Sequence, residues 1–129
     1  MATMTSLSAG LVIYDILSKS DDVKATATRV FPVAADNAKL PYVAYRCAGL
    51  ETTPQKKGVP GADALLVEVG CYAADYSGVV ALSEAVRAAL DFTQATLDGL
   101  VLRSCILVGM DEGWEDDAYV RMLSFEIRI

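Results

Sequence analysis

Five carboxylates lie within seven residues near the end of the chain, in the stretch DEGWEDD. They are Asp111, Glu112, Glu115, Asp116 and Asp117. Such a cluster could bind calcium weakly, but the D-x-D-x-D-G order of an EF-hand loop is missing. Three interpretations remain open: a solvated turn that its charge keeps from aggregating, an acidic patch at a subunit contact or lumen wall, and a metal or catalytic site.

The only tryptophan, Trp114, lies inside this acidic segment. An aromatic side chain at a loop tip is costly to expose unless it folds back onto the domain or contacts a partner. Both possibilities stay open. The candidate interface or lumen segment therefore comprises Asp111, Glu112, Trp114, Glu115, Asp116 and Asp117.

The stretch KKGVPG, residues 56–61, faintly resembles a phosphate-binding loop. A Walker motif needs GxxxxGK followed by Ser or Thr, placed between a strand and a helix. Here the lysines precede the glycine and a strand follows. We therefore expect Lys56 and Lys57 on an exposed arm, or paired with acidic groups of a neighbour.

The chain contains no histidine, which removes the usual general base near neutral pH and the commonest zinc ligand. Its three cysteines, Cys47, Cys71 and Cys105, are widely spaced and form no CxxC motif. They are predicted to be small apolar fillers of strands in a reducing compartment. We expect no enzyme, no metal and no cofactor.

The composition favours one folded domain spanning residues 1–129, with 53% hydrophobic residues. A net charge of −6 argues against non-specific binding to nucleic acid. The first lysine is Lys19, and the apolar run 11–13 is too short for a signal peptide or membrane span. A cytoplasmic protein is expected.

The N-terminal half is predicted to form a helix and two strands. In the helix, 5–18, Leu7, Leu11, Tyr14 and Leu17 form one apolar stripe. The polar run 18–28 is expected to be a loop. A β-like run at 29–33 contains a proline, which suits a sheet edge, and 41–49 has the composition of a strand.

A polar arm, residues 51–62, separates that strand from the next one at 63–73, as a hairpin tip or a crossover. Connections of this length are usually functional or disordered. The arm is the second candidate site, for contact with another subunit. Its residues are Glu51, Thr52, Thr53, Pro54, Gln55, Lys56, Lys57, Gly58, Val59 and Pro60.

The remaining residues predict a helix and further strands. Val79, Leu82, Val86 and Leu90 share one face of a helix over 75–91. A β run at 99–110, the acidic loop 111–117 and an alternating strand at 118–129 follow. The fold class is therefore α+β: a mainly antiparallel sheet, order αβββαββ, with both helices packed on one face.

Four pieces of the chain, in order, resemble a known family: RVFPVAADNAKLPYVAYRCAG, the glycine-marked arm, VEVGCYAADYSGVVALSEAVRAAL, and a closing β run after an acidic turn. The most specific matches are LPYV at 40–43 with Tyr45, and CYA at 71–73 running through Tyr76 into SEAVRAAL at 83–90. Together they resemble the tail completion proteins of long-tailed bacteriophages, also called head–tail joining or tail terminator proteins.

The resemblance implies a structural role in the virion. Family members form a ring, of six subunits in the assembled tail, on the head-proximal end of the tail tube. The ring stops tube polymerisation and offers a docking surface to the head connector or stopper protein. The implied partners are copies of the chain itself, the major tail tube protein and that connector, first in the host cytoplasm and then in the virion tail. No cofactor, membrane or sequence-specific nucleic acid is implied, and no catalytic residue carries over.

Three physical expectations agree with that role. The arm can reach a neighbour or the tube, an edge strand at 29–33 can add to the sheet of an adjoining subunit, and an acidic inner wall lets DNA pass without sticking. The alternative function is a non-catalytic α+β binding or adaptor module that dimerises through its sheet. An enzyme ranks third, because no histidine and no nucleophile–base pair is present.

Overall fold

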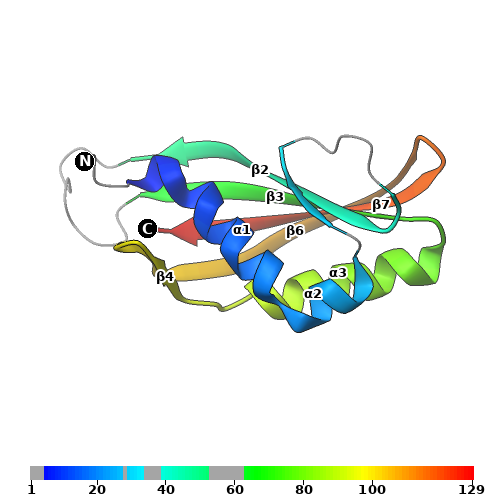
Figure 1. The fold of residues 1–129 in the computed structure, drawn as a ribbon. Coiled ribbons are helices and arrows are strands. Elements are labelled where there is room, and N and C mark those ends of the chain that lie inside the picture. Colours follow the sequence, from blue (N-terminus) through cyan, green and yellow to red (C-terminus); the bar gives the residue numbers. More distant parts are fainter. Residues whose placement is uncertain (1–4, 28, 34–38, 53–62) are drawn as a thin grey trace.

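The computed structural model describes residues 5–27, 29–33, 39–52 and 63–129 (Figure 1). The elements are η1 (Ser6–Ser8), α1 (Ala9–Lys19), α2 (Asp21–Thr26), β1 (Val30–Pro32), β2 (Tyr42–Glu51), β3 (Ala64–Ala73), α3 (Tyr76–Leu90), β4 (Ala95–Leu97), β5 (Leu100–Leu102), β6 (Ser104–Glu115) and β7 (Ala118–Arg128).

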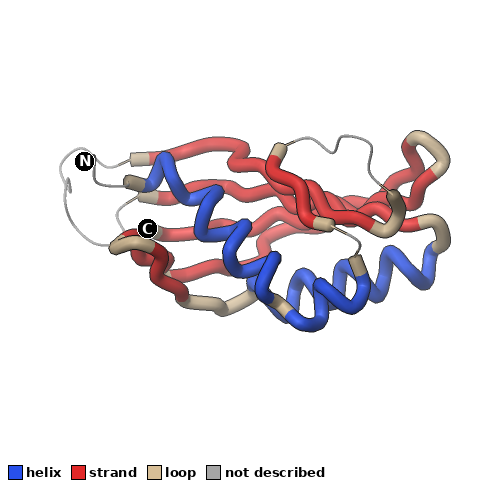
Figure 2. The backbone as a smooth tube through the Cα atoms, in the orientation of Figure 1, coloured by secondary structure: helices blue, strands red, loops and turns tan. Residues whose placement is uncertain are grey.

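A five-stranded sheet in the order β1-β2-β3-β7-β6 forms the frame of the fold. All neighbouring strands run antiparallel except β1, which runs parallel to β2. β4 and β5 form a separate hairpin. The helices lie on one side of the sheet (Figure 2). The α+β class, with an N-terminal helix and a long later helix on one face, is confirmed.

Alternating apolar residues of β3 and β7 make the floor of the core. Val67 pairs with Phe125, and Val69 with Leu123, and all four side chains are at most 3% exposed. Because strand side chains point to alternate faces, this register places the apolar rows of both strands on the helix-covered face.

Helix α3 packs on the apolar residues of β3 and β7, as its apolar periodicity predicts. Its residues Val79, Leu82, Val86 and Leu90 are buried. Asp75 is the N-cap of the helix, since its Oδ1 accepts a hydrogen bond from the Gly78 backbone N–H at 2.6 Å.

The N-terminal helix turns a different face to the core than the sequence suggested. Leu17 is buried, but Leu7, Leu11 and Tyr14 are 83%, 56% and 41% exposed. The buried face is instead built from Ala9, Val12, Ile13 and Leu17. The helix has two apolar faces, and the described residues cover only one of them.

The polar run 18–28 was expected to be a loop, and this is wrong. It contains α2, whose first turn is capped by the Ser20 hydroxyl accepting from the Val23 N–H at 3.3 Å. Val23 is 1% exposed and anchors the helix. A single buried residue among charged neighbours gives too weak a period to predict this helix.

Two phenylalanines provide a matched test of the core. Phe125 is fully buried, whereas Phe92 is 78% exposed. We expect Phe125→Ala to lower the free energy of unfolding by about 3–5 kcal/mol, through lost apolar burial and a cavity. Phe92→Ala should stay within about 0.5 kcal/mol of the parent protein. Urea denaturation followed by circular dichroism measures both, and equal losses would contradict this core.

Candidate interaction site

The acidic segment is mostly a strand, which corrects the predicted loop over 111–117. β6 continues to Glu115, and only Asp116 and Asp117 form the turn, with φ values of 49° and 61°. Glu112 pairs with Arg121, and Trp114 with Tyr119, across the hairpin. These cross-strand partners extend the ladder into a stretch whose composition alone suggests a loop.

The strand geometry separates the carboxylates instead of gathering them. Asp111 and Glu115 point to one face of the hairpin and Glu112 to the other, because side chains alternate along a strand. Within the described residues, no group of three acidic, cysteine or histidine side chains could hold a metal ion. The acidic segment is therefore a charged surface.

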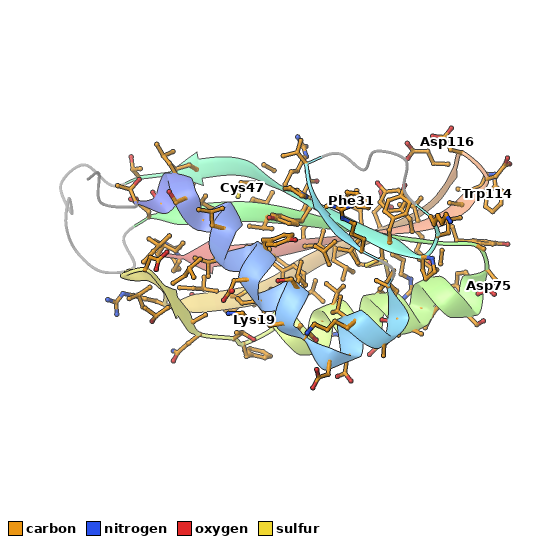
Figure 3. All side chains as sticks on the ribbon, viewed as in Figure 1. Lys19, Phe31, Cys47, Asp75, Trp114 and Asp116 are labelled. Carbon is orange, nitrogen blue, oxygen red and sulfur yellow. The ribbon has the colours of Figure 1, made fainter. Side chains whose placement is uncertain are left out.

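Trp114 both folds back and stays accessible. Its ring meets Tyr119 edge to face at a centroid distance of 4.9 Å, and Tyr119 meets Tyr76 in the same way at 5.9 Å. Trp114 nevertheless remains 58% exposed. It lies with Asp116 and Asp75 at one end of the molecule (Figure 3).

Arg121 ties this end of the sheet to α3. Its Nε lies 3.2 Å from Glu112 Oε2, and its Nη atoms donate to Ser83 Oγ at 3.1 Å and to the Tyr76 hydroxyl at 3.2 Å. A hydrogen bond with Tyr76, and then the Arg121 guanidinium, lower the pKa of Glu112. Arg121 and its partners Glu112, Ser83 and Tyr76 thus form a polar joint between the β6–β7 hairpin and α3.

The arm joins two neighbouring antiparallel strands, since Glu51 pairs with Ala64. The hairpin alternative is therefore correct. Its base is tied down: Ser6 Oγ donates to Asp63 Oδ2 at 2.6 Å, and the Ile129 N–H donates to the Asp63 carbonyl at 3.0 Å. Of the candidate arm residues, Glu51 and Thr52 are described. Outside the described residues lie Thr53, Pro54, Gln55, Lys56, Lys57, Gly58, Val59 and Pro60.

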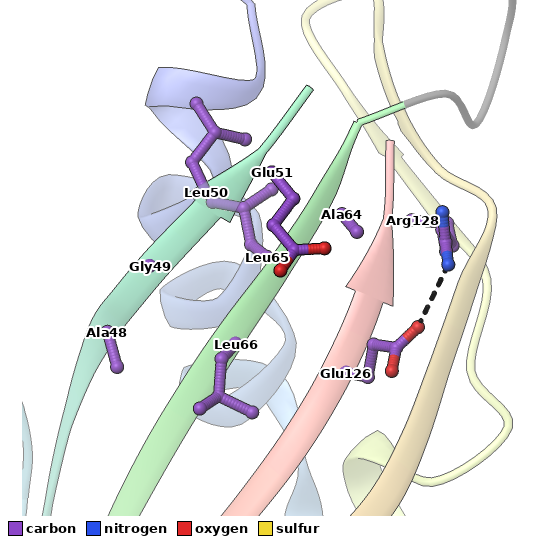
Figure 4. Close-up of a pocket in the computed structure, with 9 residues that line it drawn as sticks. All are labelled: Ala48, Gly49, Leu50, Glu51, Ala64, Leu65, Leu66, Glu126 and Arg128. Carbon is purple, nitrogen blue, oxygen red and sulfur yellow. Dashed lines mark hydrogen bonds and ion pairs between the residues drawn. The ribbon is translucent and has the colours of Figure 1, made fainter. Parts of the chain in front are cut away.

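A shallow hollow lies beside the base of the arm, on the face of the sheet opposite the helices (Figure 4). Leu50 and Leu66, each 38% exposed, contribute its apolar part. Its charged residues are Glu51, Glu126 and Arg128, and the Glu126 carboxylate pairs with Arg128 at 3.2 Å. The hollow offers contact area in which apolar and charged groups lie side by side.

Two of the three cysteines fill the core as expected. Burial raises the pKa of Cys71 and of Cys105 to about 12, so both thiols are protonated at neutral pH. Cys47 differs, because it is exposed.

The sequence analysis missed two apolar surfaces, one along each edge of the sheet. The first, here called the α1 rim, consists of Leu7, Leu11, Tyr14 and Val33. The second, the β6 rim, consists of Phe92, Ile106, Val108 and Met110. Their exposed fractions lie between 41% and 83%, and between 45% and 78%. The only signal in the sequence was a surplus of apolar residues over one stripe in the N-terminal helix.

Comparison with known protein families assigns the chain to one of them. The sequence model of "tail completion protein gp17" matches residues 12–129. The chain belongs to this tail completion family. It is therefore a structural phage tail protein by family, as the resemblance implied.

A solved structure shares the fold. A chain in the virion of a native gene transfer agent particle superposes with a TM-score of 0.76 over 98% of both chains, at 16% identity. At that identity the likeness concerns the fold. No curated protein matches the sequence. None of the helices in the described part of this tail completion protein is long and apolar enough to span a membrane.

The joint around Glu112 can be tested by its titration. We expect Tyr76→Phe and Arg121→Met each to raise the pKa of Glu112 toward its ordinary value of 4.5, because each removes a group that favours the carboxylate. A lowered pKa adds stability above the ordinary value, and that stability is lost as the pH falls through the folded-state pKa. NMR titration of the side-chain carboxyl measures the shift. Arg128→Met, which removes the partner of Glu126, should leave it unchanged; an unaltered Glu112 titration in both variants would refute the joint.

Proposed function

We propose that this tail completion protein acts as a ring of identical subunits on the head-proximal end of a long tail tube. There it ends tube polymerisation and joins the tail to the head connector. It assembles in the host cytoplasm and becomes part of the virion tail. Family membership over residues 12–129 supports the proposal, as does a shared fold with a chain of a virion particle.

The observation that carries it is the pair of apolar rims. Each rim holds four large exposed apolar side chains, and they lie along opposite sides of the sheet. Exposed apolar clusters of this kind mark contact surfaces. An adaptor that dimerises through one self-complementary patch needs a single such surface, whereas a ring needs two different ones. The rims therefore favour the ring over the dimer.

Charge supports passage of DNA through such a ring. Residues 63–129 contain four Lys and Arg and twelve Asp and Glu, a net charge of −8. Residues 1–52 contain five of each sign. If the acidic segment of β6 and its turn line the lumen, the wall repels the phosphate backbone and DNA moves without binding.

The arm is assigned to contacts with the tube or a neighbouring subunit. Deleting residues 53–60 leaves a four-residue connection, 52 and 61–63, between the paired ends of β2 and β3. Such a length suits a hairpin. We expect a folded domain with a thermal transition close to that of the parent chain, together with tail tubes of uncontrolled length.

Circular dichroism and electron microscopy of assembled tails measure these two outcomes. Thr96→Ala, in the β4–β5 hairpin, serves as a control that should preserve tube length. Unfolding of the deletion variant would place the arm in the core. Tubes of normal length, with the variant folded, would show that the arm makes no contact needed for termination.

A further inference from the structure

We propose that neighbouring subunits meet head to tail, with the α1 rim of one copy against the β6 rim of the next. The inference rests on the proposed ring and adds which two surfaces form its contact. The occupant of each rim is therefore a second copy of this chain.

The α1 rim is a continuous surface, and the β6 rim follows the edge of the sheet. In the α1 rim, Leu7, Leu11 and Val33 line one open hollow of about 450 Å³, with Tyr45 and Cys47. The Tyr14 and Tyr45 rings lie 6.4 Å apart, which joins Tyr14 to the same surface. In the β6 rim, Ile106, Val108 and Met110 lie on one edge strand. Because the register shifts between Leu107 and Gly109, Ile106 lies opposite Glu126 and Met110 opposite Leu123, so the rim passes round the edge from one face of the sheet to the other.

Phe92 is held against that edge, since its N–H donates to the Cys105 carbonyl at 2.7 Å. Asp91 Oδ1 also accepts from the Leu107 N–H at 3.0 Å. These two bonds occupy edge groups of β6 that an added strand would use. They leave the apolar side chains of the rim exposed.

The opposite edge is equally unsuited to strand addition. β1 has three residues, and Pro32 has no N–H to donate. The expectation that 29–33 adds to a neighbour's sheet is therefore disfavoured. Strand addition is thus hindered at β1 and at the Cys105–Leu107 stretch of β6, and the contact we infer is made by packing of the rim side chains.

The two rims cannot cover each other within one chain, because they lie along opposite edges of the sheet. An isologous contact would use one rim twice and leave the other exposed. The head-to-tail contact buries both in every subunit and can repeat until a ring closes.

Charge favours the same pairing. The β6 rim continues along the strand into Asp111, Glu112 and Glu115, of which Glu112 already pairs with Arg121. The α1 rim adjoins Arg29, which is exposed, lies over the Phe31 ring at 5.1 Å and lines a hollow with Tyr14. Arg46 also adjoins this rim, but its guanidinium pairs with Glu68 at 2.6 Å. Arg29 on one side, and Asp111 and Glu115 on the other, are therefore the opposite charges that flank the two apolar surfaces. Two β6 rims placed together would bring carboxylates close, which costs binding energy.

Cys47, an exposed cysteine in the hollow of the α1 rim, provides a native crosslinking site. In Val108→Cys and Met110→Cys variants, mild oxidation should give a ladder of disulfide-linked oligomers on non-reducing gels. Thr96→Cys, on the β4–β5 hairpin, should give none, and Cys47→Ser added to either rim variant should abolish the ladder. The reaction is run at high protein concentration and with purified tail tubes, so that a ring formed only on a tube is captured.

Complementation separates head-to-tail from isologous contacts. Leu11→Asp disables one rim and Val108→Asp the other, and each should weaken self-association about tenfold or more while the circular dichroism spectrum is unchanged. Mixed together, the two variants should form pairs that grow no further, because only one intact contact remains per pair. Light scattering or native mass spectrometry measures this. Self-dimers of either single variant would overturn the inference.

The two proposals fail in different ways. If the parent chain forms rings but neither rim variant is crosslinked through Cys47, the contact lies elsewhere and the ring function stands. If the parent chain neither associates with itself nor limits tube length, the proposed function fails and the rim contact fails with it.

Discussion

The fold depends on one constraint: the helices cover a single face of the sheet. The inward-facing apolar residues of β3 and β7 are buried because α1 and α3 lie over them. They include Val67, Val69, Leu123 and Phe125. Burial of this kind provides most of the stability of a domain this size. The helices do not cover the opposite face or the two edges of the sheet. The surfaces that carry the proposed function are what this one-sided packing leaves uncovered.

Elements whose information is local could be predicted from the sequence. The apolar period of α3 and the alternation in β3 and β7 come from burial of one face, which leaves a repeating pattern in the chain. The strand end at 111–115 could not be found in this way. Its pairing depends on Tyr119 and Arg121 lying opposite Trp114 and Glu112, and that register is a property of the hairpin. Helix α2 was missed for a related reason, since Val23 alone reaches the core.

In the candidate site, too, features with a local sequence pattern could be predicted and features that depend on tertiary packing could not. The sequence left three interpretations open for the acidic segment and two for Trp114. In the structure these residues are exposed and lie on a strand and its turn instead of in a loop. The rims were not identified, because an apolar residue on a helix or strand is first assigned to the core. Leu11 and Val12 are chemically alike, yet 56% of one and 1% of the other is exposed. Which of two apolar faces is buried depends on where the sheet and α3 lie, and no local pattern records that position.

The occupied groups at the sheet edges limit how far an assembly of this chain can grow. An open edge strand pairs with any other open edge and tends to grow without limit. Here Pro32 removes a donor from one edge, and Asp91 and Phe92 occupy groups of the other. In the head-to-tail contact we propose, each interface is then a small side-chain surface, which by itself binds weakly because association costs translational and rotational freedom. Closing the ring adds a final contact between subunits already held in place, so that contact costs little further freedom. The closed ring we propose is therefore favoured over open chains, so a subunit in the proposed terminating role would not start a polymer of its own.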